Sequence, residues 1–599
     1  MHADERSDRI APGEWLALSG IAVVFILLRL ELFVDPALHL GWNSDAAIFG
    51  LMAKAIFAGR DFPIFFWGQS YMGPLTSLLA AAAGAVLRLA GVTPAVGPLA
   101  LRIGAAAEVL AAIFFYWSGL RRAFDARTAT VAALWLAIGP AYLFFFTIAP
   151  IGGEQMFVLS AIIFWFSVRT MLGAPRDWFV FGLLAGIGWW IHQGVVFAIG
   201  ASVLIVVLRS SVWATAWREP RLLDRLLLRQ RWRGHDRLLV SSLRVLNGLL
   251  LLWIVEDALF CLDLPVPALF LFSPLLEPVI VFVVVRIVLA LRFDDDARSA
   301  VALAAAGWRG WTVPLLLAVC GALIGYAPVI VGGMLHLYPR TYGLSVPLLP
   351  LRVVLQHVRT LARADFWALI GASGSPAGVV VGAAVTMLLL IALVRHGRTL
   401  LDLVSLRARD YGERGIAAAT IALCVIFYVT SRRAHEGSAR YIVSALPMVY
   451  AFAAREIWAL RPRVVGIAAA AAIALALAVP RMQQVRDVAA GRGEEYSGLG
   501  GNFDPRPTLH AIDAGGYSIC HAEYWIAYKL QWVSEERVRF IPFHSFDRTP
   551  AASRLLEAAP GRKCYVDDAG AVRLFDRSAI DESVMHTARE RLQRLREGN

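Results

Sequence analysis

The chain has 599 residues, of which 58% are hydrophobic and 17% are charged, and its mean hydropathy is +0.62. Soluble domains contain about 25% charged and about 45–50% apolar residues, so these values argue against a soluble protein. The net charge of +12 comes almost entirely from arginine, because Lys54, Lys529 and Lys563 are the lysines. The arginines form short clusters between apolar runs, as in membrane proteins, and no nucleic-acid motif accompanies them.

Apolar runs of membrane length recur along the chain as far as residue 480. They predict an all-α polytopic membrane protein with about thirteen transmembrane helices, followed by a small C-terminal extracytoplasmic α/β domain. The predicted spans are residues 14–34, 99–119, 127–146, 155–171, 178–191, 194–209, 239–260, 272–292, 311–335, 376–395, 415–430, 441–459 and 464–480.

The loops between these spans alternate between arginine-rich and arginine-poor. If the N-terminus is cytoplasmic, the basic loops fall inside, and those around Asp45, Gly152 and His192 fall outside. If the apolar run at residues 75–89 were counted as a full transmembrane span, it would disrupt this alternation. We therefore interpret it as a helix that lies at the membrane interface or enters the membrane only partway. Residues 210–238 are basic with interleaved Leu and Trp, which favours a helix lying on the cytoplasmic membrane surface near anionic lipid.

The polar tail forms the second predicted domain, so residues 1–480 are membrane domain and residues 481–599 are extracytoplasmic. Residues 516–532, 537–543 and 563–568 are strand-prone, and residues 551–559 favour a helix. Cys520 and Cys564 lie in this tail. An outer location permits a disulfide between them, but their spacing leaves the pairing open. The arginine-rich, lysine-poor composition suggests a bacterial protein, and hence the inner (plasma) membrane.

The first outer loop, residues 35–98, carries an unusual set of polar groups. Asp45 lies just beyond the first span, at the start of an amphipathic helix, where Ser44 or Asp45 is suited to be the N-cap. A polar, aromatic, Gly/Pro-containing run follows at residues 67–74 and includes Gln69 and Tyr71. The aromatic residues 65–67 are more simply interpreted as membrane-interface anchors.

Further polar groups lie at the outer ends of other predicted spans. Ionisable groups at such positions are costly in a membrane and usually functional. A lipid-phosphate ligand would also need cations beside it, preferably arginines with their fork of donors. The residues concerned are Glu154, His192, His336, Arg340, Arg432, Arg433, Arg440 and Tyr441.

This layout resembles the GT-C superfamily of membrane glycosyltransferases, which includes protein O-mannosyltransferases and lipid A aminoarabinose transferases. The resemblance rests on Asp45 in the first outer loop, on Glu154 at the start of the fourth span, and on Arg440-Tyr441 before a late span that contains Pro447. Most such loops carry a second acid beside the first, whereas Asp45 is followed by Ala46.

The resemblance implies transfer of a sugar from a polyprenyl-phosphate donor to a glycan, lipid or protein acceptor at the outer membrane face. Asp45 would assist the acceptor hydroxyl, and Glu154 would be the second carboxylate. Relatives sometimes use a divalent cation, so a Mg²⁺ or Mn²⁺ ion shared by Asp45 and Glu154 is a further expectation. The expected substrate-binding residues are Gln69, Tyr71, His192, His336, Arg340, Arg432, Arg440 and Tyr441.

Two other functions stay open from the residues alone. A transporter or flippase of a lipid-linked saccharide would also need outer arginines, but it needs polar groups near the bilayer midplane as well. A non-catalytic membrane scaffold with an outer binding domain predicts that Asp45→Asn leaves any sugar transfer unchanged.

Overall fold

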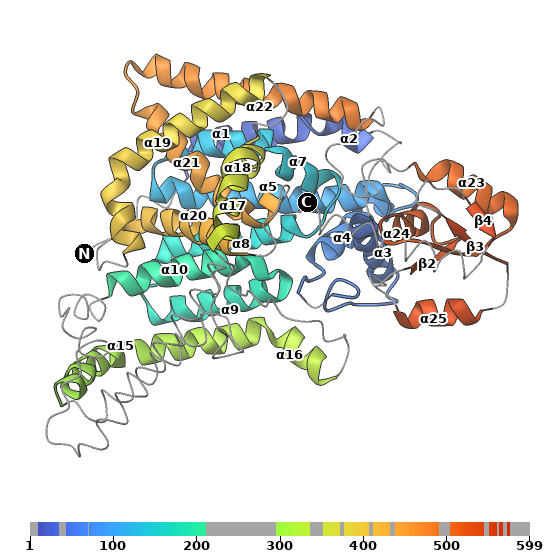
Figure 1. Ribbon diagram of the computed structural model, residues 1–599, viewed down its shortest axis with the longest axis horizontal. Coiled ribbons are helices and arrows are strands. Elements are labelled where there is room, and N and C mark those ends of the chain that lie inside the picture. Colours follow the sequence, from blue (N-terminus) through green and yellow to red (C-terminus); the bar gives the residue numbers. More distant parts are fainter. Residues whose placement is uncertain are drawn as a thin grey trace.

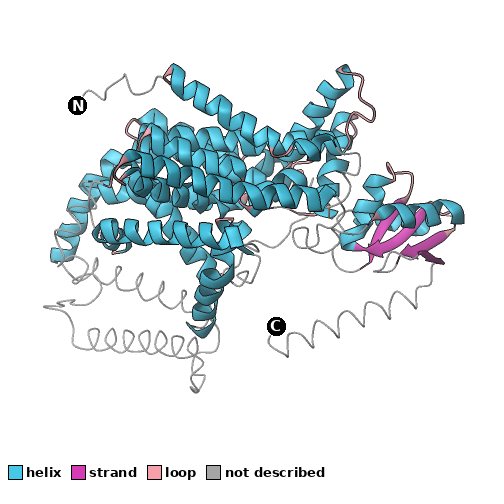
Figure 2. Cartoon of the chain, turned by 90° about the horizontal axis from the view of Figure 1, so that it is seen from above, coloured by secondary structure: helices cyan, strands magenta, loops and turns pink. Residues whose placement is uncertain are grey.

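The computed structural model shows a helical bundle with a small α/β unit at one end (Figures 1 and 2). The structure describes residues 10–34, 44–69, 71–210, 295–335, 351–371, 376–405, 411–431, 438–489, 504–543, 550–559, 562–566 and 572–574.

The first half of the bundle follows the predicted apolar runs closely. Two helices that lie outside the predicted full spans, α3 and α4, form the first outer loop. The elements are α1 (Pro12–Leu27), α2 (Leu30–Val34), α3 (Ser44–Phe57), α4 (Leu75–Leu89), α5 (Pro98–Ala123), α6 (Ala126–Ile138), α7 (Ala141–Ile148), α8 (Gly153–Thr170), α9 (Pro175–Ile191), the 3₁₀ turn η2 (Gln193–Val195) and α10 (Val196–Arg209).

The second half continues the bundle with longer helices and two irregular segments. The irregular segments are a π-helical turn, η4, and a 3₁₀ segment, η5. The elements are α15 (Asp295–Gly325), α16 (Ala327–Met334), α17 (Leu351–Thr360), η4 (Leu361–Asp365), α18 (Phe366–Leu369), α19 (Pro376–Val404), α20 (Gly412–Thr430), η5 (Ser438–Ala445), α21 (Leu446–Trp458) and α22 (Arg463–Ala489).

Membrane-spanning character is clear in several of these helices. Within the described residues, four helical stretches are long and apolar enough to cross a membrane, and two bent pairs bring this to six. Large apolar side chains on the bundle surface, such as Val394 and Val464, are exposed, as expected of surfaces that face lipid. The predicted spans 239–260 and 272–292 and the surface helix 210–238 lie outside the described residues.

The predicted span 127–146 is a broken helix. It divides into α6 and α7, which meet at an angle of 52°. Gly139 at the break has φ +88°, which favours glycine, and Pro140 follows it. Buried Arg29 donates to the carbonyl oxygen of Ala137 (2.8 Å) and to Thr147 (3.2 Å), so its side chain satisfies groups that the break exposes.

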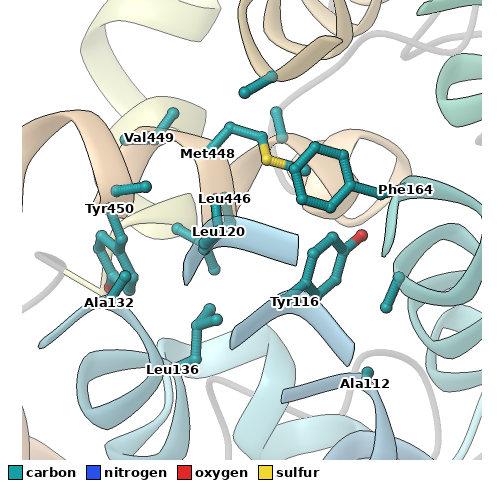
Figure 3. Packing of buried hydrophobic residues seen from close by; sticks show 14 of the residues in the cluster. Ala112, Tyr116, Leu120, Ala132, Leu136, Phe164, Leu446, Met448, Val449 and Tyr450 are labelled. Carbon is teal, nitrogen blue, oxygen red and sulfur yellow. The ribbon is translucent and has the colours of Figure 1, made fainter. Parts of the chain in front are cut away.

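The bundle core is built from α5, α6, α8 and α21. Tyr116 of α5 packs against Phe164 of α8, with ring centroids 5.9 Å apart, and Met448 of α21 lies beside them (Figure 3). Trp135 of α6 meets Tyr450 of α21 edge to face at 5.5 Å. These side chains are almost completely buried, and this core holds the outer ends of the helices in fixed positions.

The C-terminal unit contains a four-stranded sheet in the order β2-β1-β3-β4. The central strand β1 is parallel to both neighbours, and β4 is antiparallel to β3. Cys520 and Cys564 face each other in this register and form a disulfide. The elements are α23 (Pro505–Gly515), β1 (Ile519–Glu523), α24 (Tyr524–Val533), β2 (Arg539–Phe543), α25 (Pro550–Ala558), β3 (Lys563–Val566) and β4 (Val572–Leu574).

The tail confirms the α/β prediction but corrects one of its elements. Residues 516–532 were predicted as a strand-prone run, yet the strand ends at Glu523 and the helix α24 begins at Tyr524. The run is rich in aromatic and large apolar side chains, which favour strands, but here those side chains lie on two faces of a helix. One face packs on the sheet, and the other packs on α3.

Candidate active site

Asp45 lies in the first turn of α3, and the C-terminal unit holds it there. The hydroxyl of Tyr524 donates to Asp45 Oδ1 at 2.5 Å. The Ser44 hydroxyl donates to the Tyr524 backbone carbonyl, so two consecutive residues of the outer loop bind one residue of α24. Within the described residues, Tyr524 is the side chain that hydrogen-bonds Asp45. The sequence did not indicate this contact, which joins positions 479 residues apart.

The helices α3 and α24 are closely packed along their whole contact. A side chain at Gly50 would place its Cβ 2.7 Å from the Trp532 ring, so only glycine permits this approach. The Lys54 amino group lies 4.3 Å from the centre of the same ring. Burial lowers the pKa of Lys54, although Glu536 and Glu535 partly oppose the shift. The α/β unit is therefore seated on the helix that carries Asp45 and fixes its position.

Arg440 lies within electrostatic reach of Asp45, as the sequence predicts for a site at one face, and Tyr441 is its direct neighbour. Desolvation acts to lower the pKa of Arg440, but Tyr441, Asp45 and Tyr142 outweigh it and the pKa is raised. Arg440 donates to the Tyr441 hydroxyl at 3.2 Å and lies over the Tyr441 ring at 5.1 Å. Arg440 is a solvent-exposed residue, and its guanidinium has donors beyond the one that binds Tyr441. A carboxylate and an accessible guanidinium thus share this end of the bundle.

A second carboxylate, Asp365, approaches the same region and was missed in the sequence. It lies in the π-helical turn η4 and is 1% exposed, and the Tyr428 hydroxyl of α20 donates to it. Tyr142 of α7 lies within electrostatic reach of both Asp365 and Arg440. Single π-helical turns are frequent at functional sites. The sequence signal was weak, since Asp365 lies outside the predicted spans and next to Phe366 and Trp367.

Glu154, the other predicted catalytic carboxylate, faces inward. It is fully buried, and its oxygens accept from Thr76 (3.0 Å), Gly152 N–H (2.9 Å) and Ile151 N–H (3.3 Å). The Thr76 hydroxyl also lies 3.2 Å from Glu108 Oε2. These contacts fasten the start of α4 to the turn before α8.

Thr76 lies between two buried carboxyl groups, Glu154 and Glu108. Its single hydroxyl proton can be donated to only one of them at a time. Glu154 also accepts two backbone N–H bonds, whereas Glu108 accepts none from the described backbone. Thr76 and the two glutamates therefore form one buried hydrogen-bonded group that ties α4 to α5 and α8.

The same contacts test the expected metal ion. A cation shared by Asp45 and Glu154 would need oxygen lone pairs of both carboxylates. The Glu154 lone pairs are directed at hydrogen-bond donors instead, and the described residues contain no group of three or more His, Cys, Asp or Glu placed to hold a metal. This arrangement does not fit a shared metal, and we derive no step through one.

The turn around His192 contacts the outer loop. Met72 and His192 form an antiparallel β-bridge, and the Gly73 N–H donates to the Ile191 carbonyl at 2.7 Å. His192 Nδ1 accepts from the Gly194 N–H at 3.0 Å, and burial lowers the His192 pKa to about 4. His192 is therefore neutral at physiological pH and helps to shape this loop.

The remaining predicted residues divide into two sets. Gln69 is buried within the loop, and Tyr71 packs at the edge of the apolar cluster between α3, α4 and α24. Phe65 and Phe66 are buried too, at 5% and 1% exposure, so their interpretation as membrane-interface anchors was wrong. Phe66 packs edge to face against Phe49 of α3, with ring centroids 4.7 Å apart. His336, Arg340, Arg432 and Arg433 lie outside the described residues.

Comparison with known proteins gives structural neighbours only. No family model matches the sequence, and no curated protein matches it. The fold is similar to the oligosaccharyltransferase AglB from Archaeoglobus fulgidus in complex with an inhibitory peptide and a dolichol-phosphate. The identity is 15% and the TM-score is 0.42, over 93% of this chain and 69% of that one.

A second neighbour is ArnT from Cupriavidus metallidurans bound to undecaprenyl phosphate. The identity is 12% and the TM-score is 0.34, over 91% of this chain and 88% of that one. Both neighbours are GT-C glycosyltransferases, the superfamily that the sequence resembles. Because both TM-scores lie below 0.5, the functional argument rests on the residues of the site.

Proposed function

We propose that the chain is a GT-C-type membrane glycosyltransferase that uses a polyprenyl-phosphate sugar as donor and acts at the outer membrane face. The observation that carries this proposal is that Asp45 and the exposed Arg440 lie within electrostatic reach of each other at one end of the bundle. A carboxylate supplies a base for an acceptor hydroxyl, and a guanidinium supplies paired donors for a phosphate. The disulfide of the neighbouring α/β unit suits an oxidising outer compartment.

The proposed reaction is a single displacement at the anomeric carbon. The acceptor oxygen forms a bond to that carbon while the bond from the carbon to the phosphate oxygen breaks. The proton of the acceptor hydroxyl passes to Asp45, and the electron pair of the broken bond leaves with the phosphate. That leaving group is already ionised, so it needs electrostatic stabilisation from Arg440 more than it needs a proton.

Glu154 has a different role in this proposal from the one that the sequence suggested. Its buried contacts with Thr76 and the 151–152 backbone hold the outer loop that carries Asp45. We therefore assign Glu154 as a positioning residue. The donor sugar is the variable of the experiment below.

The test is a transfer assay with a panel of polyprenyl-phosphate sugars. Asp45→Asn should lower the transfer rate by about a hundredfold or more, because a positioned base contributes factors of that size. Arg440→Ala should lower the rate and raise the KM for the donor. Asp61→Asn is the matched control, since Asp61 lies at the surface of the same outer loop. Its carboxylate accepts a hydrogen bond from the Trp67 indole N–H there.

The outcomes separate the three functions. Asp61→Asn should keep the wild-type rate. Full transfer by a folded Asp45→Asn protein would contradict the catalytic assignment. Movement of a lipid-linked saccharide across vesicles without any transfer would favour the transporter, and neither activity with any donor of the panel would favour the scaffold.

A further inference from the structure

A cavity of about 620 Å³ lies at the end of the bundle opposite Asp45. It is formed where α1, α6 and α20 begin and where α5 and α8 end. The first described residues and the start of α1 are at this end, and the α/β unit is at the other (Figure 1). The proposed transfer reaction uses no residue of this cavity.

The charged wall of the cavity is predominantly basic. Three arginines and two glutamates line it: Arg121, Arg122, Arg169, Glu14 and Glu413. Arg121 is paired with Glu14 at 2.9 Å, and Arg122 lies 4.0 Å from Glu413. Arg169 is exposed and lies over the Trp165 ring at 5.6 Å. The lining therefore has a net charge of +1, from three arginines and two glutamates.

The other wall is aromatic. Phe114 and Trp165 line the cavity, and they belong to a continuous row of rings. Trp15 stacks on Phe114 at 6.4 Å, Phe114 meets Phe115 at 5.6 Å, and Phe115 meets Trp165 at 5.3 Å. Trp15 is 51% exposed, so this row continues onto the apolar outer surface of α1.

We propose that this cavity binds the phosphate headgroup of an anionic phospholipid from the leaflet on that side. The arginines would hold the phosphate, and the aromatic row would carry the acyl chains toward the bilayer. A soluble phosphate ion would use the basic wall but gain nothing from the rings, whereas a phospholipid matches both walls. Arginine beside tryptophan is also the composition of a membrane–water interface.

The bound lipid would join four helices at this end. Its phosphate would lie between the ends of α5 and α8, and it would reach the starts of α1 and α20 through their paired arginines. Binding to the folded state alone stabilises that state. The lipid should therefore raise the thermal unfolding midpoint as well as occupy the cavity.

The test uses the full chain purified in detergent, with phosphatidylglycerol or phosphatidylcholine added before native mass spectrometry. Wild type should retain one phosphatidylglycerol under conditions that remove phosphatidylcholine. The double variant Arg122→Gln/Arg169→Gln should bind phosphatidylglycerol at least about tenfold more weakly, because hydrogen bonds to charged groups are strong. Arg176→Gln is the matched control, since Arg176 is 90% exposed and does not line the cavity.

Each other outcome would overturn the proposal. Equal losses in the double variant and in Arg176→Gln would mean that binding follows the overall charge. Retention of phosphatidylcholine would rule out recognition of the anionic headgroup. Displacement of the lipid by millimolar inorganic phosphate would assign the site to a soluble anion.

Folding of the double variant has its own control. Arg169→Lys keeps the positive charge and should keep most of the lipid binding. Without added phospholipid, the double variant should unfold at the wild-type temperature and transfer sugar at the wild-type rate. If the double variant lost lipid binding but also unfolded at a lower temperature without added phospholipid, the loss would reflect misfolding and would contradict the assignment.

Discussion

At the scale of single residues, the hydrogen bond between Asp45 and Tyr524 changes the interpretation of the site. The sequence identified Asp45 from its place after the first span, but it gave no sign of a partner. Hydrophobicity patterns report which face of an element is buried, not which distant element covers it. Tyr524 is therefore a residue that only the tertiary structure connects with Asp45.

Replacing Tyr524 by Phe tests whether this bond positions Asp45. The variant keeps the ring that packs against Tyr528, at 5.8 Å, and removes the hydroxyl that donates to Asp45. We expect kcat for sugar transfer to fall by about tenfold to a hundredfold, because small errors in placing a reacting group have effects of this size. The KM for the donor should stay constant, since Tyr524 has no proposed contact with the phosphate.

Tyr528→Phe is the matched control, because it removes a hydroxyl from the same helix and should leave kcat near the wild-type value. A purely structural role for Tyr524 would lower the unfolding temperature and the amount of active enzyme while leaving kcat per folded molecule unchanged. Kinetics normalised to folded protein would detect that outcome.

At the scale of elements, the apolar runs predicted most described helices, because helix length and lipid exposure both depend on local composition. They did not predict the break at Gly139, the 57° bend between residues 310–325 and 327–334, or the π-helical turn with Asp365. The break at Gly139 has a local signal that hydropathy ignores, since Pro140 follows the glycine, whereas Asp365 in the π-helical turn is bound by Tyr428 of another helix. Asp365 shows the consequence, since a functional candidate was missed where the helix is irregular.

The pair α9 and α15 gives an element-scale prediction. Gly182 and Gly186 of α9 face Ala318 and Ala322 of α15, one helical turn apart in each case. A Cβ at Gly186 would lie 2.2 Å from the Ala322 carbonyl oxygen, and one at Gly182 would lie 2.0 Å from that of Ala318. Small residues at this spacing let two membrane helices approach backbone to backbone.

Gly186→Ala should therefore lower the thermal unfolding midpoint of the purified protein, because the two backbones must separate, at a cost of about 1–3 kcal/mol. Gly310→Ala is the matched control within α15, where an added Cβ meets nothing within 4 Å. That change should be neutral or stabilising by up to about 1 kcal/mol, since alanine favours helix over glycine. Equal midpoints for the two variants would contradict close packing of α9 on α15.

At the scale of the whole molecule, the two ends of the helical bundle carry different sets of polar groups. One end carries Asp45, Arg440 and the disulfide-bonded α/β unit, and the other carries the arginine-lined cavity. Loop charge indicated this division from the sequence, since basic loops alternate with the loops that hold the candidate site. The seating of the α/β unit on α3 depends on packing at Gly50 and Trp532, and no local pattern indicates it.

The division makes a topological prediction that can be tested with single cysteines. Asp513 lies in the α/β unit and Arg176 lies at the opposite end, and both are exposed. In a background with Cys261 and Cys320 changed to serine, Asp513→Cys should react with a membrane-impermeant maleimide in intact spheroplasts. Arg176→Cys should react only after the membrane is permeabilised, because the loop-charge pattern predicts that its basic loop faces the cytoplasm.

The reverse pattern would have a direct chemical consequence. Asp45 is bonded to Tyr524 of the α/β unit, so the candidate site must face the same compartment as Asp513. If Asp513→Cys were protected and Arg176→Cys labelled, the site would open to the cytoplasm, where nucleotide-linked sugars are available and a lipid-phosphate donor is not required. The labelling experiment therefore tests the class of donor as well as the orientation, and it does so without any transfer assay.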